Sequence, residues 1–123
     1  EKFFLFLEND DLCKRTKIAG NNIYIIRNAF IDHKGFSSSK IDREELEYLR
    51  NWHWMWSKFY FNKKYYGFFQ AFISILPSFF SSILKILIFT ILFNKKKRKI
   101  YQFRFSGILN SLTGKTSWYR IKD

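Results

Sequence analysis

The sequence lacks several features that would assign it quickly to a class of protein. Its lone cysteine, Cys13, cannot form an internal disulfide, which fits a reducing compartment. No basic stretch followed by an apolar core and a small-residue cleavage site opens the chain, so no signal peptide is predicted. The first residues, Glu1-Lys2-Phe3-Phe4, include no initiator Met and enter an apolar segment at once. We therefore expect a fragment of a longer protein.

Acidic residues are scarce relative to basic ones. The 123 residues include 22 Lys and Arg against 10 Asp and Glu, giving a net charge of +12, and 22% of residues are aromatic. Such a charge favours nucleic acid, phosphorylated substrates or an anionic membrane as partner. The aromatic residues gather from Trp52 onward beside a long apolar run, an arrangement that suits the lipid headgroup layer. A membrane is the first prediction, and nucleic acid is the second.

The first third of the chain has an alternating α/β pattern. Residues 3–7 form a continuous apolar run typical of a buried strand. A helix of about three turns follows, with Asn9 or Asp10 as its cap and Gly20 as its left-handed stop. Residues 22–31 are rich in β-branched and aromatic residues and predict two further short strands.

The acidic turn after the first predicted strand is the strongest candidate for chemistry. Glu8 and Asp11 would lie at the carboxyl end of the strand, where open α/β sheets bind their ligands. A carboxylate in that position can take the proton of an attacking hydroxyl. The alternative is that the acidic residues only cap the helix, and spacing alone favours that alternative.

An ordered series of motifs resembles the end of the catalytic domain in rhamnosyltransferase-like family 2 glycosyltransferases. It comprises F-F-L-F-L-E-N-D-D-L-C-K-R (3–15), Gly20, H-K-G-F-S (33–37) and R-N-W-H-W-M-W-S-K-F-Y (50–60). The resemblance covers nearly the whole chain and implies the C-terminal piece of a GT-A type α/β domain. It further implies inverting transfer of a sugar, with rhamnose one candidate, from a nucleotide-sugar donor to a lipid-linked or polysaccharide acceptor. The implied location is the cytoplasmic face of the bacterial inner membrane.

The resemblance also implies catalytic residues. It makes Asp10, Glu8 and Asp11 the candidates for the general base, with Asp10 the first choice. The family most often has Asp where this chain has Asn9, and an amide cannot act as a base. Arg15 is placed among the substrate-binding residues, although pairing with a neighbouring carboxylate is its more usual role.

The resemblance assigns a further group to the turn-rich loop at 32–40. His33 would hold a divalent metal, Mg²⁺ or Mn²⁺, or the donor diphosphate, while Gly35 and Ser37 would allow close approach to phosphate. The alternative is an ordinary loop histidine. Phe36 replaces the second Gly of the family motif. The nucleotide-binding half and its D-x-D motif are absent from this sequence, so we expect the fragment alone to be inactive.

The remaining sequence predicts a membrane-associated helical tail. A helix capped by Asp42 should run to Gly67, which breaks it. Residues 68–93 are almost wholly apolar, with Lys85 as their one charge and Pro77 dividing them into two pieces that are each marginal for spanning. Lysines at both ends favour a re-entrant hairpin or in-plane helices over a single crossing. The alternative is a protein core or dimer interface.

Four segments follow from these patterns: 1–40 (end of the catalytic domain), 41–66 (aromatic amphipathic helix), 67–94 (membrane-associated hairpin) and 95–123 (basic tail, with a helix near 103–112). The predicted membrane-binding residues are Trp52, Trp54, Trp56, Lys95, Lys96, Lys97 and Arg98.

Three other functions are alternatives to sugar transfer. A non-catalytic membrane scaffold would explain the tail alone. A nucleic-acid binder would explain charge and rings but not the apolar residues 86–93, in which no cation is interleaved. Thr113-Gly114-Lys115-Thr116 resembles the end of a phosphate-binding loop, but Leu109 stands where that loop needs Gly, and an ATPase is rejected.

Overall fold

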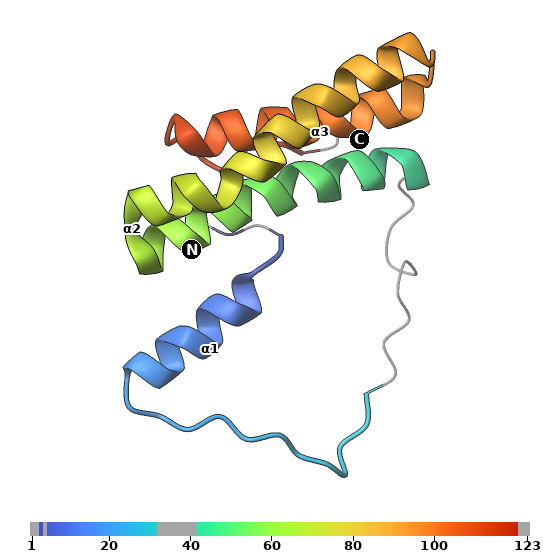
Figure 1. Cartoon of the computed structure of the whole chain (residues 1–123). Coiled ribbons are helices and arrows are strands. Elements are labelled where there is room, and N and C mark those ends of the chain that lie inside the picture. The colour runs from blue at the N-terminus through green and yellow to red at the C-terminus, as the bar shows by residue number, and fades with distance from the viewer. Residues whose placement is uncertain (1–2, 4, 32–41, 121–123) are drawn as a thin grey trace.

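Three α-helices form the framework of the molecule. The structure, a computed structural model, describes residues 3, 5–31 and 42–120. Its helices are α1 (Glu8–Ile18), α2 (Arg43–Ile91) and α3 (Lys95–Leu112), in that order along the chain. Figure 1 shows α1 below a bundle made by α2 and α3, with residues 19–31 continuing from the end of α1.

Helix α1 matches the three-turn helix predicted from the sequence, but the cap predicted at Asn9 or Asp10 is wrong, because the helix begins at Glu8 with Leu7 as its N-cap. Acidic Asp10 and Asp11 occupy its first turn, and basic Arg15 and Lys17 its last, so the charges complement the helix dipole at both ends. Gly20 follows with a φ of 79°, which confirms the predicted left-handed stop.

Helix α2 begins where the sequence predicted and is divided where it predicted. The Asp42 side chain accepts a hydrogen bond from the Glu44 N–H at 3.0 Å. Gly67 has φ 85° and ψ 168°, which are not helical values, and it separates an N-terminal arm (residues 43–66) from a C-terminal arm (residues 68–91). In Figure 1 the chain reverses direction between the two arms. Helical structure continues through Pro77, so the expected division of the apolar segment at this residue is not seen.

Helix α3 runs back along both arms of α2. Its first turn is capped by Asn94, whose side chain accepts from the Lys97 N–H at 3.0 Å. The Phe103 ring stacks on Tyr48 of the N-terminal arm at 5.2 Å, and Phe105 lies 5.2 Å from Phe79 of the C-terminal arm. The basic run expected to be a tail is therefore the beginning of a helix, which extends eight residues earlier than the predicted 103–112.

The core lies where α3 meets the two arms. Its buried apolar residues come from all three helical segments and are Met55, Phe59, Ala71, Ile75 and Ile108. The closest approach is at Gly107, where an added Cβ would lie 2.4 Å from the Trp52 carbonyl oxygen. Glycine is required there because the two backbones leave no room for a side chain.

The segment after α3 returns along the N-terminal arm. The Trp56 indole N–H donates to the Lys115 carbonyl oxygen at 2.9 Å. The Tyr119 ring lies 5.8 Å from Trp52 and 5.0 Å from Phe103. Residues 113–120 thus cover the aromatic side of the bundle without helical structure of their own.

The α/β fold expected from the sequence is wrong. The described residues are helical or irregular, and neither 5–7 nor 22–31 forms a strand. A strand needs a neighbour to pair its backbone groups, and the described part of the chain offers none. Ile25 and Phe30, expected in strands, are each 91% exposed. Apolar β-branched runs predicted strands, whereas the structure is a helical bundle with an extended, exposed connection.

Candidate membrane interface

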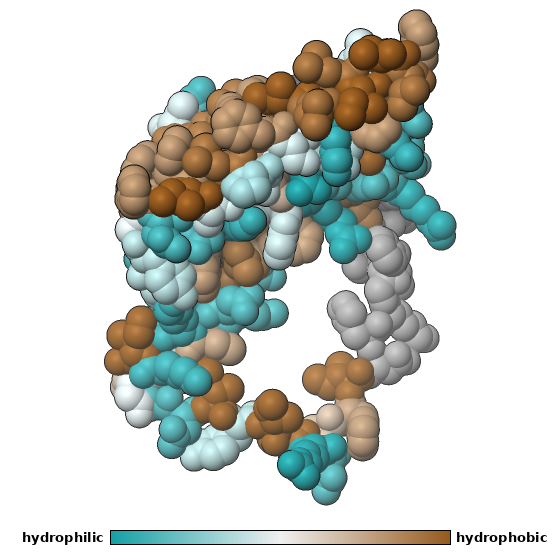
Figure 2. Space-filling model, viewed as in Figure 1, coloured by the Kyte–Doolittle hydropathy of each residue, from teal (hydrophilic) through white to brown (hydrophobic). Residues whose placement is uncertain are grey.

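One side of the C-terminal arm carries large apolar side chains that face away from the protein. They lie three, four or seven residues apart, which are the spacings that place side chains in a single stripe along a helix. We call this the apolar stripe, and its members are Phe69, Phe72, Ile73, Phe80, Ile83, Leu84, Leu87, Ile88 and Ile91. Figure 2 shows apolar side chains gathered along this arm up to the turn that leads into α3.

The opposite side of the arm packs on the protein. Ala71, Ile75 and Ser82 are buried, and Phe79 packs against the core beside them. A surface helix of a water-soluble bundle normally presents polar residues outward. The outward side of this arm is instead apolar, and only 11% of the most apolar window of α2 is buried. It is the one helix, in the part of the chain that the structure describes, long and apolar enough to cross a membrane.

Cations border both ends of the apolar stripe. Lys63 precedes it, with Nζ 5.7 Å from the Phe68 ring centroid. The predicted basic residues follow it on the first turn of α3. Lys96 pairs with Glu47 at 3.8 Å, and Lys97 lies over the Phe89 ring at 5.4 Å. Lys95, Lys96 and Lys97 are exposed, while Arg98 is partly buried.

Lys85, the one charge within the apolar arm, turns toward α3. Its ammonium group donates to the Tyr101 hydroxyl at 3.1 Å and lies 4.8 Å from the centroid of that ring. The charge is therefore held on the protein side of the arm, away from the apolar stripe. This partner was not foreseen from the sequence, because Tyr101 lies 16 residues away on another helix.

The three predicted membrane-binding tryptophans have different environments. Trp52 is 1% exposed and Trp56 is 3% exposed, so both are core residues of the bundle in this conformation. Trp54 is 41% exposed and contacts Phe6 edge-on at 5.5 Å. The periodicity of the aromatic cluster indicated a helix face but not whether protein or lipid covers it.

Asp11 of the acidic motif anchors α1 to α2. Its carboxylate is 95% buried, accepting from Arg15 Nε at 2.9 Å, from the Tyr65 hydroxyl at 2.7 Å and from Lys64. Burial alone would raise the pKa of Asp11, but the hydrogen bonds and positive charges outweigh it and hold the pKa below its ordinary value. Because three donors already bond to this carboxylate, it stabilises the contact between α1 and α2 and is poorly suited to accept a proton from a substrate.

The other two acidic candidates are less occupied. Glu8 is partly buried and begins α1, and its Oε2 atom is buried without a hydrogen-bond partner among the described residues. Asp10, two residues further along α1, is exposed. Arg15, assigned to substrate binding, pairs with Asp11 as the more usual role suggested.

The remaining predicted residues, His33, Gly35 and Ser37, lie outside the described part of the chain. Among residues 3, 5–31 and 42–120, no three His, Cys, Asp or Glu side chains come together as a metal site. The divalent metal stays a prediction from the resemblance, and no chemical step is derived through it.

A buried histidine links the returning C-terminal segment to α2. His53 is 0% exposed; its Nε2–H donates to the Tyr119 carbonyl at 2.9 Å, and the Ser117 hydroxyl lies 3.1 Å from Nδ1. Burial is the main cause that lowers the pKa of His53, and the nearby Arg120 charge adds to it. Local sequence patterns could not reveal these contacts, since the covering segment lies more than 60 residues away.

Comparison with known proteins gives no match: no family model, no curated protein and no solved structure is similar to this chain.

Proposed function

We propose that this chain docks onto a membrane through the apolar stripe and thereby holds a sugar-transferring enzyme beside a lipid-linked acceptor. The observation that carries the proposal is the stripe itself: nine large apolar side chains, all exposed on one side of one helix. Monomeric water-soluble proteins rarely expose so long a contiguous apolar surface, and such surfaces mark protein or membrane contacts.

The cations favour a membrane as the partner. Lysines flank both ends of the stripe, where long basic side chains can reach the headgroups of a bilayer. Each basic residue near an anionic bilayer contributes about 1 kcal/mol of attraction. Basic residues at both ends of an apolar segment also favour the cytoplasmic side, in agreement with the proposed location at the inner face of a bacterial cytoplasmic membrane.

The arm lies in the plane of the membrane surface rather than across it. At 1.5 Å per residue its 24 residues span about 36 Å, enough to cross a hydrocarbon core of about 30 Å. However, α3 runs back along the arm with Lys95, Lys99 and Arg104 among its residues. A crossing would carry α3 into the bilayer, at about 2.5–3.5 kcal/mol for each cation near the centre. In-plane docking leaves those charges at the headgroups.

The test is sedimentation with anionic vesicles. Leu84→Glu combined with Leu87→Glu places two charges in the middle of the stripe, and we expect at least a tenfold loss of vesicle partitioning. Ile25→Glu makes the same chemical change at a residue that is 91% exposed but lies outside the stripe, and should have less than a twofold effect. Unchanged binding by the double variant, or loss of binding only through dimer dissociation in gel filtration, would exclude the proposal.

Sugar transfer is supported by the resemblance, which places Glu8 and Asp10 in the acidic motif of the family. Asp10 is exposed, and a carboxylate within reach of an acceptor hydroxyl can take its proton. In the proposed step, that hydroxyl oxygen bonds to the anomeric carbon, the carbon–oxygen bond to the nucleotide diphosphate breaks, and the proton passes to Glu8 or Asp10. The electron pair leaves with the diphosphate.

Separate substitutions in the full natural polypeptide identify the base. Glu8→Gln or Asp10→Asn should lower kcat about 100-fold or more when it removes the base, since general bases contribute about 10²–10⁴. Cosedimentation with vesicles should be unchanged in both variants. Full transferase activity in both would contradict this role and leave a membrane scaffold without catalysis.

A further inference from the structure

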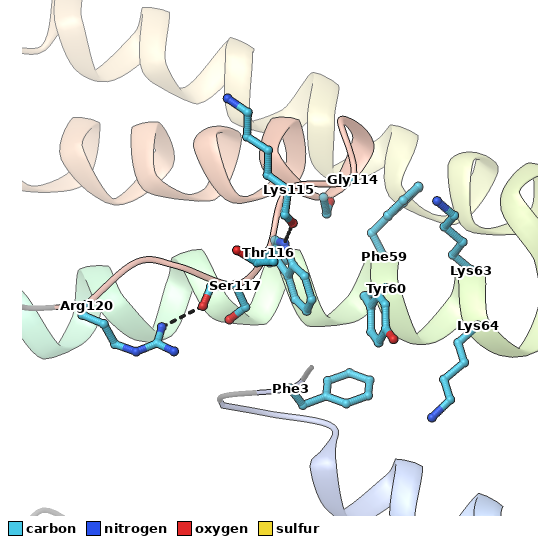
Figure 3. A pocket seen from close by; sticks show the side chains of 12 residues that line it. Phe3, Phe59, Tyr60, Lys63, Lys64, Gly114, Lys115, Thr116, Ser117 and Arg120 are labelled. Carbon is cyan, nitrogen blue, oxygen red and sulfur yellow. Dashed lines mark hydrogen bonds between the residues drawn. The ribbon is translucent and has the colours of Figure 1, made fainter. Parts of the chain in front are cut away.

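A second binding site lies between the N-terminal arm and the returning C-terminal segment. It is a cavity of about 770 Å³, bounded by Phe3, Trp56, Tyr60 and the loop after α3. That volume is within the range of pockets that hold small organic ligands. Figure 3 shows the loop residues on one side of this pocket and the N-terminal arm on the other.

The lining of this pocket is rich in basic residues. Lys63, Lys64, Lys115 and Arg120 all contribute, and none of the described lining residues is acidic. Lys64 is neutralised by Asp11, and Arg120 donates to the Ser117 carbonyl at 2.9 Å. Lys63 and Lys115 are exposed; in Figure 3 Lys63 stands beside Phe59, and the Lys115 side chain extends away from the aromatic rings. Two long flexible cations at the rim of a pocket can reach a multiply charged anion bound in it.

A hydroxyl group also belongs to the lining, beside Lys115. Thr116 follows Lys115 in the loop, and its side chain has no hydrogen-bond partner among the described residues. Its neighbour Ser117, in contrast, is occupied by His53. A phosphate oxygen would take a hydrogen bond from a free hydroxyl and charge-assisted bonds from lysines.

The apolar walls leave room for more than a bare phosphate. Tyr60 stacks on Trp56 at 5.0 Å and meets Phe3 edge-on at 5.0 Å, so three rings form a continuous wall. Lys63 at the rim also lies 5.7 Å from the ring of Phe68, next to the first residue of the apolar stripe. The pocket therefore adjoins the proposed membrane surface.

We infer that this pocket binds a phosphate or diphosphate group whose substituent packs against the aromatic wall. The site uses Gly114, Lys115 and Thr116 in a geometry unlike that of a nucleotide-hydrolysing loop, because α3 ends at Leu112 before these residues instead of beginning after them. The ligand chemistry is shared by a membrane phospholipid or lipid diphosphate and by a free phosphate compound. The inference goes beyond the membrane docking and does not depend on the sugar-transfer step.

Calorimetry with inorganic pyrophosphate tests the site in the absence of any membrane. We expect saturable binding that weakens at least tenfold in Lys63→Gln combined with Lys115→Gln. Thr116→Val keeps the charge and should weaken binding about threefold or more. The matched control is Lys17→Gln with Arg27→Gln, which removes two exposed cations outside the pocket and should change the affinity less than twofold.

Vesicles distinguish the two sources of phosphate. Phosphatidic acid exposes a phosphate monoester, and vesicles of phosphatidylserine at equal surface charge provide the comparison. A preference for phosphatidic acid that disappears in the Lys63 and Lys115 double variant identifies a lipid headgroup, and binding of pyrophosphate without such a preference identifies a soluble ligand. The inference is overturned if neither pyrophosphate binding nor a preference for phosphatidic acid is seen. It is also overturned if the Lys17 and Arg27 control variant loses as much binding as the Lys63 and Lys115 variant. Failure of membrane docking would instead show as loss of phosphatidylserine binding with pyrophosphate binding retained.

Discussion

Two buried ionisable residues connect distant parts of the chain to α2. Asp11 joins α1 to the N-terminal arm through Lys64 and Tyr65, and His53 joins the same arm to Tyr119 and its neighbours. Both are satisfied by hydrogen bonds in the protonation state that prevails at neutral pH. The attachment of α1 therefore depends on the charge state of Asp11, and that of the C-terminal segment on the charge state of His53.

Asp11→Asn should lower the free energy of unfolding by about 1–3 kcal/mol. The variant loses charge-assisted bonds to Lys64 and Arg15, whose side chains are partly exposed, so the cost is less than for a fully buried pair. Asp10→Asn changes the exposed neighbour and should alter stability by less than about 0.5 kcal/mol. Urea unfolding of both variants measures the difference, and equal stabilities would refute the anchoring role.

Acid should weaken the attachment of the C-terminal segment. The pKa of His53 is lowered in the folded state, so the unfolded state binds the proton more readily. Stability from this site is full above the ordinary histidine pKa of about 6.5 and is lost as the pH falls from there toward the lower folded value. Hydrogen exchange of residues 113–120 between pH 7.5 and pH 5 should reveal the loosening.

His53→Gln should abolish this pH dependence, whereas His33→Gln should retain it, which separates the two histidines of the chain. If the exchange rates of the wild type follow only the intrinsic pH dependence of amide exchange, His53 does not control the segment.

At the level of helices, the bundle depends on the close crossing of α3 over the N-terminal arm. Gly107→Ala should destabilise the protein by about 1–3 kcal/mol because the new methyl group meets the Trp52 carbonyl. Helix propensity alone would predict the opposite, a gain of about 1 kcal/mol. Gln102→Ala, at an exposed site on the same helix, provides the control. Thermal unfolding measures the stability of both variants, and a stabilised Gly107→Ala variant would contradict the close crossing of α3 over the N-terminal arm.

Local signals predicted the helices better than they predicted their surroundings. The stop of α1 at Gly20, the Asp42 cap and the break at Gly67 are determined by neighbouring residues, and all three are confirmed. The predicted strands at 3–7 and 22–31 failed because a strand depends on a partner elsewhere. Apolar composition alone cannot supply that partner.

Long-range packing explains the other differences. α3 begins at Lys95 despite five cations at the positive end of its dipole, because Tyr101 packs on Phe89 at 5.7 Å and Lys97 and Lys99 lie over aromatic rings. The aromatic contacts outweigh the unfavourable charge. The pocket and the His53 contacts likewise join residues about 60 positions apart, beyond the reach of any local pattern.

As a whole, the molecule has two differently built sides. The apolar stripe lies on the C-terminal arm, and the polar anchors of α1 and the C-terminal segment lie on the N-terminal arm. With α3 packed between them, the bundle can hold an apolar surface against lipid while keeping Glu8 and Asp10 on another part of the molecule. Such an arrangement would confine a reaction to acceptors bound in the same membrane.

The depth of the apolar stripe in a bilayer is the most direct measurement of this account. Phe69→Cys, Phe80→Cys and Ile91→Cys, each in a Cys13→Ser background, carry a fluorophore quenched by lipids labelled at known depths. In-plane docking predicts the same shallow depth for all three, about 5–10 Å into the headgroup and acyl boundary, with a Lys17→Cys label in water. A Phe80 label at the bilayer centre between two interfacial labels, or all three labels in water, would contradict it.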